Sequence, residues 1–195
     1  FLKKLDFQNF KIRINDRRIL LKMIDYVGLS LEKVDSILIT LDKMDKIGLK
    51  GVTKELENIG LEKEKITNYL NLFNQDQSNV KAFCNSFALD NDILENLTEI
   101  MDTVKEVLKV DLVFDPTLVR GMGYYTGPIF EIEADGLSSS IGGGGRYDKM
   151  IEKFAGISVP AVGFSVRFER LVLLLEERGF KVPETKEKIG FVLKD

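Results

Sequence analysis

The feature that most constrains the fold is a change of hydrophobic period near residue 110. From about residue 30 to 110 the apolar residues recur every three or four positions, as on amphipathic helices, whereas short strand-like runs follow from Leu112 onward. Another strand-like stretch, residues 7–16, precedes this helical block. We therefore predict an α+β fold in which an antiparallel sheet is interrupted by an all-helical insertion.

The first 30 residues predict a strand and then a helix. Phe10, Ile12 and Ile14 alternate with Lys11 and Arg13, which is the pattern of a strand with one buried and one wet face. The helix that follows is expected to end at a glycine, Gly28. Its buried side would carry Ile19, Leu20, Met23, Ile24 and Val27.

The helical block predicts a series of helices. Ser30 is expected to cap a helix that continues to Gly48. Shorter amphipathic pieces follow through residues 56–73, and a long helical pattern covers residues 93–108. Between Ser30 and Leu70 the block holds seven lysines and eight acidic residues, so an RNA-binding module without enzymatic activity has little support.

The last third of the chain predicts three consecutive antiparallel strands, because each run is short, β-branched or aromatic, and bounded by glycine or proline. These runs are "DLVFDP", "YYTGPIFEIEA" and "SSSIGGGGRYDKM". The segment "VPAVGFSVRFERLVLLLEERGF" then begins extended and turns helical, with Leu171, Leu174 and Leu175 on the buried face.

Composition excludes several kinds of site. The 195 residues are 44% hydrophobic and 30% charged, with a net charge of -3, so no global positive field attracts nucleic acid. Histidine is absent and Cys84 is the one cysteine, which disfavours an internal disulfide, a zinc site or a histidine-based triad. We expect Cys84 to be a small core residue. Without a signal peptide or a long apolar run, the expected location is the cytoplasm, away from membranes.

The stretch "LVRGMGYYTG", residues 118–127, is the first chemically unusual cluster. Arg120 offers a planar fork of donors that suits carboxylate or phosphate. Tyr124 and Tyr125 would point to opposite faces if the chain is extended there. Three glycines indicate bends or a close approach to the backbone. An edge hairpin with an exposed arginine is the alternative.

Two further clusters follow. Residues 142–145 are four glycines, followed by Arg146, Tyr147 and Asp148, which can donate, stack and accept. This cluster lacks the lysine and hydroxyl residue of a phosphate-binding P-loop, and a mobile hairpin tip is the alternative. The third cluster, "FERL", places Arg170 at the start of a helix, where a glutamate and an arginine commonly form a surface ion pair.

Taken in order, "LVRGMGYYTGPIFEI", "GGGGRYDKM" and "PAVGF" leading into "FERL" resemble the histidyl-tRNA synthetase family of class II aminoacyl-tRNA synthetases. The resemblance implies part of a catalytic core in residues 1–29 and a helical insertion domain in residues 30–110 that approaches the acceptor end of tRNA. It implies the rest of the core, with the histidine motifs and the third class motif, in residues 111–180. Residues 181–195 would be a linker and the start of a truncated anticodon-binding domain.

The family's reaction joins histidine to ATP and then transfers the histidyl group to tRNA(His). By motif match, Arg120 would be catalytic and bind ATP at its α-phosphate, and Arg170 would reach the γ-phosphate. Tyr125 would hydrogen-bond the imidazole, with Tyr124 beside it and Tyr147 closing the histidine site. The pocket floor would be formed by Glu131, Gly143, Gly144 and Gly145. The resemblance implies Mg²⁺ carried mainly by the ATP phosphates, without a protein metal site.

The resemblance further implies that the chain is a fragment, inactive alone, because the first class motif, for dimerisation, and the second, for ATP, would precede Phe1. The full-length protein would be a homodimer. Two positions depart from the family pattern: Gly123 replaces the usual aspartate, and Arg167 replaces the usual glycine of the third motif. Arg167 keeps an alternative open, the histidine-binding regulatory subunit of ATP-phosphoribosyltransferase. The 80-residue insertion and the retained Arg120 and Arg170 disfavour it.

Overall fold

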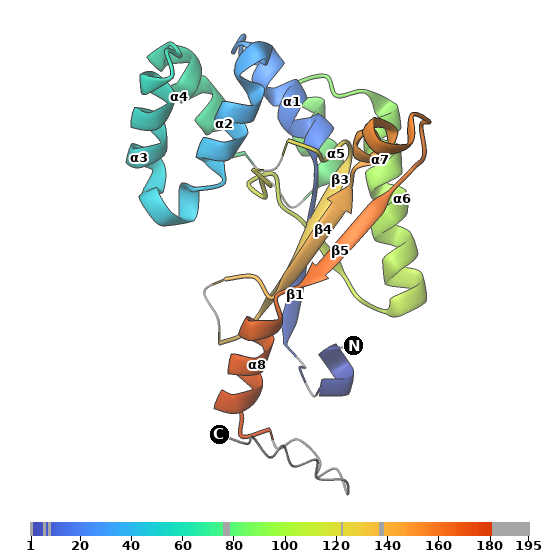
Figure 1. Cartoon of the computed structure of the whole chain (residues 1–195). Helices are drawn as coiled ribbons and strands as arrows, with labels where there is room; N and C mark the ends of the chain where they lie inside the picture. The colour runs from blue at the N-terminus through green and yellow to red at the C-terminus, as the bar shows by residue number, and fades with distance from the viewer. Residues whose placement is uncertain are drawn as a thin grey trace, which may run out of the picture.

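The computed structural model describes residues 2–5, 7, 9–75, 79–121, 123–136 and 139–180. They form a five-stranded sheet with helices on its faces and beyond its edges (Figure 1). The strands are β1 (Phe10–Asp16), β2 (Leu112–Phe114), β3 (Pro128–Ala134), β4 (Gly142–Arg146) and β5 (Val162–Val166). The α-helices are α1 (Arg17–Tyr26), α2 (Val34–Leu41), α3 (Met44–Asn58), α4 (Lys63–Leu72), α5 (Val80–Asn85), α6 (Asn91–Leu108), α7 (Asp148–Ala155) and α8 (Phe168–Glu177), with 3-10 helices η1 (Leu2–Leu5) and η2 (Leu31–Lys33).

The sheet has the order β2-β1-β3-β4-β5 and is mixed, which confirms the α+β class but corrects one pairing. The pairs β1–β3, β3–β4 and β4–β5 are antiparallel as predicted. The prediction for β2 is wrong, because β2 runs parallel to β1, with Ile12 opposite Leu112. A parallel neighbour needs a crossover connection, and the whole helical block is that crossover.

The helices form where the apolar period predicts them, but some of their predicted ends are wrong. α1 begins where the Asp16 carboxylate accepts a hydrogen bond from the Arg18 backbone N–H at 2.8 Å, and the chain leaves it through Gly28 at φ +69°. Ser30 precedes η2 instead of a long α-helix, and its side chain makes no capping bond with the described residues. Gly48 was predicted to end a helix, but it is a kink at φ +65° inside α3.

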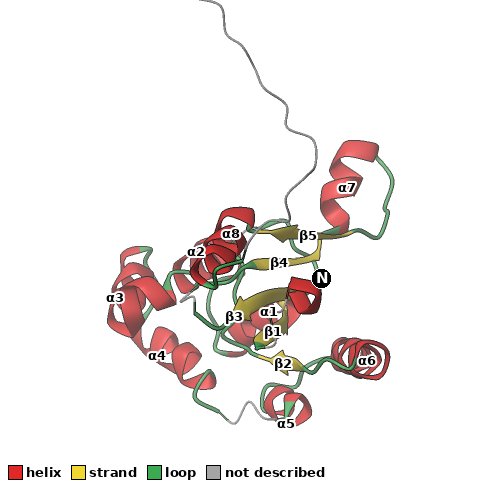
Figure 2. Ribbon diagram, turned by 90° about the horizontal axis from the view of Figure 1, so that it is seen from below, coloured by secondary structure: helices red, strands yellow, loops and turns green. Residues whose placement is uncertain are grey.

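One buried core joins the sheet to the helical block. Ile14 of β1 belongs to the same cluster as residues of α1 to α6, and the rings of Phe83 and Phe114 are 5.5 Å apart. Cys84 is 1% exposed in this core, as predicted. Figure 2 shows α6 beside β2 at one edge of the sheet and α7 beyond β5 at the other. The proposed domain boundaries stay a prediction.

A smaller core lies under α8, at the end of the sheet where β1 begins. Leu171 and Leu174 of α8 are buried there beside Phe7, Ala134 and Ile141. Leu175 packs against the same cluster while remaining partly exposed, so the predicted apolar face of this helix is confirmed. The predicted linker and anticodon-binding segment, 181–195, lies outside the described residues.

The four glycines form strand β4 in the interior of the sheet, between β3 and β5, so the alternative of a hairpin tip is wrong. Asp148, predicted within the same strand run, instead begins α7. Among the described residues, none of the helices has the length and apolar character needed to cross a lipid bilayer.

Candidate functional site

One row of residues across the sheet places the centre of the site. Arg13 of β1 lies opposite Glu131 of β3, Glu131 opposite Gly143 of β4, and Gly143 opposite Ser165 of β5. Residues at matching register positions share one face of a sheet. Glu131 therefore stands in the middle of this face.

Glu131 gathers three donors on a single oxygen atom. Its Oε1 accepts hydrogen bonds from Arg120 Nη1 in a short ion pair, from Ser140 Oγ at 3.1 Å and from Arg167 Nη2 at 3.4 Å. The Arg120 side chain is 15% exposed. Burial opposes its charge, but Glu131 and Tyr125 together hold the pKa of Arg120 above its ordinary value. Arg120 is thus a fixed, charged and oriented guanidinium instead of the exposed arginine of an edge hairpin.

Gly143 and Gly145 make room for the residues that face them. A Cβ atom on Gly143 would lie 3.0 Å from Arg120 Nη1, and one on Gly145 would lie 2.7 Å from Cδ1 of Tyr125. Because successive residues of a strand face opposite sides, Gly144 faces away from the side of Gly143 and Gly145. A Cβ there would lie 1.9 Å from the carbonyl oxygen of Gly163, so Gly144 permits the close approach of β5 and does not form the floor beneath Arg120.

The three predicted tyrosines form one aromatic group. The ring centroids of Tyr124 and Tyr125 are 4.6 Å apart, and those of Tyr124 and Tyr147 are 6.1 Å apart with the rings perpendicular. An extended chain, the condition under which Tyr124 and Tyr125 would point to opposite faces, is not present, because the chain turns at residues 123–124 and β3 begins only at Pro128. Tyr125 is buried and Tyr124 is partly exposed.

Tyr125 connects this aromatic group to the charged centre. The Arg120 guanidinium carbon lies 5.9 Å from the Tyr125 ring centroid. Arg170 joins the centre from the other side, since its Nη1 donates to the carbonyl oxygen of Ser140 at 2.8 Å while the Ser140 hydroxyl donates to Glu131. The predicted residues thus form a continuous series of contacts from Tyr147 to Arg170.

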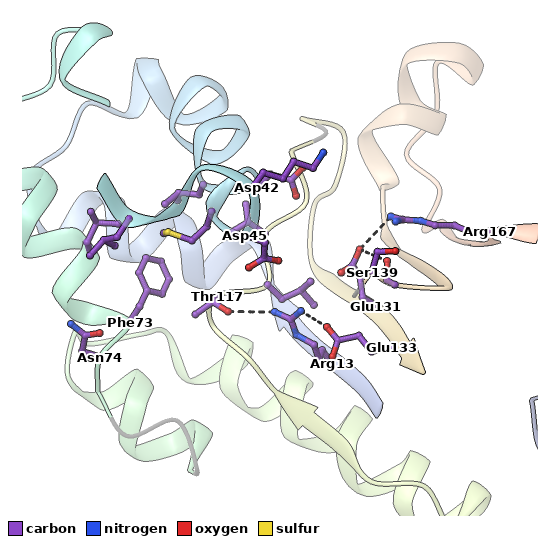
Figure 3. A pocket seen from close by; sticks show the side chains of 18 of the residues that line it. Arg13, Asp42, Asp45, Phe73, Asn74, Thr117, Glu131, Glu133, Ser139 and Arg167 are labelled. Carbon is purple, nitrogen blue, oxygen red and sulfur yellow. Dashed lines mark hydrogen bonds and ion pairs between the residues drawn. The ribbon is translucent and has the colours of Figure 1, made fainter. Parts of the chain in front are cut away.

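A cavity of about 740 Å³ opens beside Glu131, between the sheet and the helical block (Figure 3). Glu131 and Arg170 line it, whereas Arg120, which is paired with Glu131, and the tyrosines are not among its lining residues. The residues that sequence reasoning did not assign to the site include Arg13, Asp42, Glu133, Ser140 and Arg167. Arg167 was noted in the sequence as a departure from the expected motif, but it was given no role in the site.

Asp42 brings the helical block into the site. A Cβ on Gly121, next to Arg120, would lie 3.2 Å from Asp42 Oδ2. Partial burial, reinforced by the negative charge of Glu131, raises the pKa of Asp42, while Arg120 and the Gly121 backbone N–H oppose the increase. No local sequence signal predicts this contact, which joins the end of α2 to a loop 79 positions later.

Arg13 supports the loop that leads to Arg120. Its Nε donates to Asp115 Oδ2 at 2.7 Å and its Nη1 to Glu133 Oε1 at 2.5 Å. Asp115 also accepts two hydrogen bonds from Thr117. This cluster ties β1 to the segment after β2. The described residues contain no group of three histidine, cysteine or acidic side chains placed to hold a metal ion.

Comparison with known proteins identifies close relatives. A family model described as "Histidyl-tRNA synthetase" matches residues 1–171. The histidine–tRNA ligase of Leifsonia xyli subsp. xyli (strain CTCB07) is 40% identical over 189 residues, covering 90% of this chain and 43% of the relative. That of Korarchaeum cryptofilum (strain OPF8) is 36% identical, covering 88% and 40%. The crystal structure of histidyl-tRNA synthetase from Nostoc sp. PCC 7120 matches with a TM-score of 0.78 at 26% identity, covering 93% of this chain and 45% of that one. The chain therefore spans less than half the length of these relatives.

Proposed function

The chain belongs to the histidyl-tRNA synthetase family, and on that premise we propose that the complete protein activates histidine with ATP and transfers the histidyl group to tRNA(His). The observation that carries this proposal is the series of contacts that joins Tyr125, Arg120 and Glu131. In this series an aromatic ring lies next to a guanidinium that is charged, oriented and largely withdrawn from solvent.

Arg120 is the proposed catalytic residue. As the histidine carboxylate attacks the α-phosphate, negative charge grows on the phosphate oxygens, and a preorganised guanidinium stabilises that charge more in the transition state than in the ground state. Glu131 receives one N–H of Arg120 through Nη1. Because a guanidinium carries five N–H donors, this ion pair orients the fork and leaves further donors for the phosphate.

The tyrosine group is the proposed histidine site. Tyr125 would hydrogen-bond the imidazole of the substrate, Tyr124 would lie beside it, and Tyr147 would close the site. The Tyr147 ring packs directly against Gly163 of β5, where an added Cβ atom would lie only 2.4 Å from the Tyr147 hydroxyl. This contact with β5 positions the ring. A rigid aromatic pocket suits a planar ring such as imidazole.

The cavity is the proposed ATP site. Arg170 and Glu131 line it, and Arg170 would reach the γ-phosphate. Mg²⁺ would accompany ATP, held mainly by phosphate oxygens, and would neutralise part of the phosphate charge. The helical block, which forms the opposite wall of the cavity, would approach the acceptor end of tRNA(His). We further propose a cytoplasmic homodimer.

The test is histidine-dependent exchange of pyrophosphate into ATP by the complete protein, followed by charging of tRNA(His). We expect both activities. The alternative is the histidine-binding regulatory subunit of ATP-phosphoribosyltransferase, which the ligase relatives at 36–40% identity disfavour. A protein that binds histidine without any exchange, and that stimulates an ATP-phosphoribosyltransferase catalytic subunit, would overturn the synthetase proposal in favour of this alternative.

A further inference from the structure

Arg167 points into the cavity. It immediately precedes α8, at the position where the third class motif usually has glycine, and its side chain is 37% exposed. Figure 3 shows the side chain directed toward Glu131, and Nη2 lies 3.4 Å from Glu131 Oε1. The guanidinium therefore lies on the cavity wall beside Glu131, although part of the side chain remains in contact with solvent.

Positive charge exceeds negative charge in the immediate surroundings of Glu131. Arg120 and Arg167 share the single carboxylate of Glu131, and Arg170 is joined to the same centre through Ser140. Burial and then the nearby charges of Arg170 and Arg120 lower the pKa of Arg167, which Glu131 and Asp42 only partly offset. Three guanidinium groups near the two carboxylates of Glu131 and Asp42 leave one net positive charge beside the cavity, which a phosphate group would neutralise.

Glu131 holds Arg167 much less tightly than it holds Arg120. The Arg167 contact is long and its arginine is 37% exposed, whereas the Arg120 contact is short and its two side chains are mostly buried. A long and partly solvated ion pair contributes little to stability, so exchanging it for a phosphate group costs little. Arginine is also the side chain best suited to grip phosphate with two parallel hydrogen bonds.

We propose that Arg167 is a phosphate-binding residue that adds a third guanidinium to the polyphosphate site formed by Arg120 and Arg170. This inference rests on the proposed function, since it assigns part of the ATP site. Its content is specific to this chain: the arginine at position 167 grips the phosphates of ATP and does not block the nucleotide.

The test compares the affinities of the complete protein for ATP, inorganic tripolyphosphate and adenosine by isothermal titration calorimetry. Arg167→Gln should weaken ATP and tripolyphosphate by the same factor, about 10- to 100-fold, which is the range for losing a hydrogen bond to a charged group. Adenosine affinity should not change. The control is Lys153→Gln, which removes an equal charge from an exposed position on α7 outside the cavity lining and should leave all three affinities unchanged.

Several outcomes would overturn the proposal. ATP affinity that is unchanged or higher in Arg167→Gln would mean that the side chain is a bystander or an obstruction, and a loss confined to adenosine would assign it to the base. An equal loss in Lys153→Gln would indicate general charge attraction. If Arg167→Gln does not fold, Arg167→Lys replaces it as the test variant. Lysine lacks the planar fork, so the affinity for tripolyphosphate should still fall. A wild-type affinity of Arg167→Lys for tripolyphosphate would contradict the proposal. These measurements omit histidine and tRNA, so failure of pyrophosphate exchange would overturn the proposed function without deciding the role of Arg167.

Discussion

Gly143 lies directly beneath the guanidinium group of Arg120. A Cβ atom at position 143 would be 3.0 Å from Arg120 Nη1 and 2.7 Å from the carbonyl oxygen of Phe130, which is part of the sheet backbone and cannot easily move. The absence of a side chain at position 143 is therefore what allows Arg120 to reach Glu131. A glycine in the middle of a strand makes the strand less stable, but at position 143 it leaves the space that the Arg120 side chain occupies.

Gly143→Ala should displace Arg120 and lower histidine-dependent pyrophosphate exchange on the order of 100-fold, because misplacement of a positioned group by about 1 Å has that scale of effect. The matched control is Gly142→Ala, one residue earlier on the opposite face, where the nearest atoms to a Cβ are at 3.2 Å. Gly142→Ala should retain more exchange activity than Gly143→Ala. Melting temperatures of both variants separate misplacement from unfolding, and equal activity losses would contradict the role of Gly143.

Arg120→Ala should slow adenylate formation by about 10²- to 10³-fold, the range for removing one such donor from a transition state. Histidine and ATP binding should weaken much less, and Arg120→Lys should recover only part of the rate because it lacks the planar fork. Single-turnover kinetics of the complete protein distinguishes these steps. If activation survived and only substrate binding weakened, Arg120 would be an anchor and not a catalytic residue.

Tyr125→Phe should raise the KM for histidine more than it lowers kcat. The lost hydroxyl would leave the substrate imidazole without a partner in a buried pocket, which costs about 1 to 3 kcal/mol. The ring itself should stay in place, because it packs beside Gly145 and Arg120. Steady-state exchange kinetics over a range of histidine concentrations checks this, and an unchanged KM would show that Tyr125 does not contact the imidazole.

The contacts of Asp115 should make stability sensitive to acid. Burial alone would raise the pKa of Asp115, but hydrogen bonds from Thr117 and the charge of Arg13 outweigh it and hold the pKa below its ordinary value of 3.8. The unfolded chain then binds the proton more readily than the native chain does. The stabilisation is therefore present above about pH 4 and is lost as the pH falls through the lower native pKa.

Thermal unfolding between about pH 5 and pH 3 tests this linkage. Wild type should lose melting temperature more steeply than Asp115→Asn, which should be less stable at neutral pH because Arg13 loses a charged partner. Parallel slopes for the two proteins would mean that Asp115 titrates alike in the native and unfolded states.

Tyr69→Phe should stabilise the protein or leave its stability unchanged. Tyr69 is fully buried in α4, and its hydroxyl has no hydrogen-bond partner among the residues that the structure describes. Removing an unsatisfied buried hydroxyl should increase the free energy of unfolding by about 1 kcal/mol. Urea denaturation measures the change. A clear decrease in stability would indicate that the hydroxyl is hydrogen-bonded after all.

Local patterns predicted local structure and missed long-range partners. The apolar period of α6 and the alternation in β1 depend on neighbouring residues, and both elements are confirmed. The parallel pairing of β2 was missed because a three-residue strand carries no signal of direction, and its partner lies about 100 residues earlier.

The site residues that belong to sequence motifs were likewise predicted, whereas those that depend on long-range contacts were missed. Arg120, Tyr125 and Glu131 were identified through resemblance, and the structure brings them together, although their chemical roles remain predictions. Arg167 was noted in the sequence, but the direction of its side chain depends on the charges around it. Asp42 was missed because its contact with the Gly121 segment arises only when the helical block folds against the sheet.

The order of the strands has a consequence for how the chain emerges from a ribosome. Among the five described strands β1 is made first, yet both of its partners in the sheet come late: Arg13 finds Asp115 after 102 residues and Glu133 after 120. Until then neither partner can pair with β1, and an unpaired strand edge is a hazard for aggregation during synthesis. The helices between can form in the meantime from contacts near in sequence. Folding of the nascent chain should therefore proceed from the helical block inward, with the sheet that carries the site closing last.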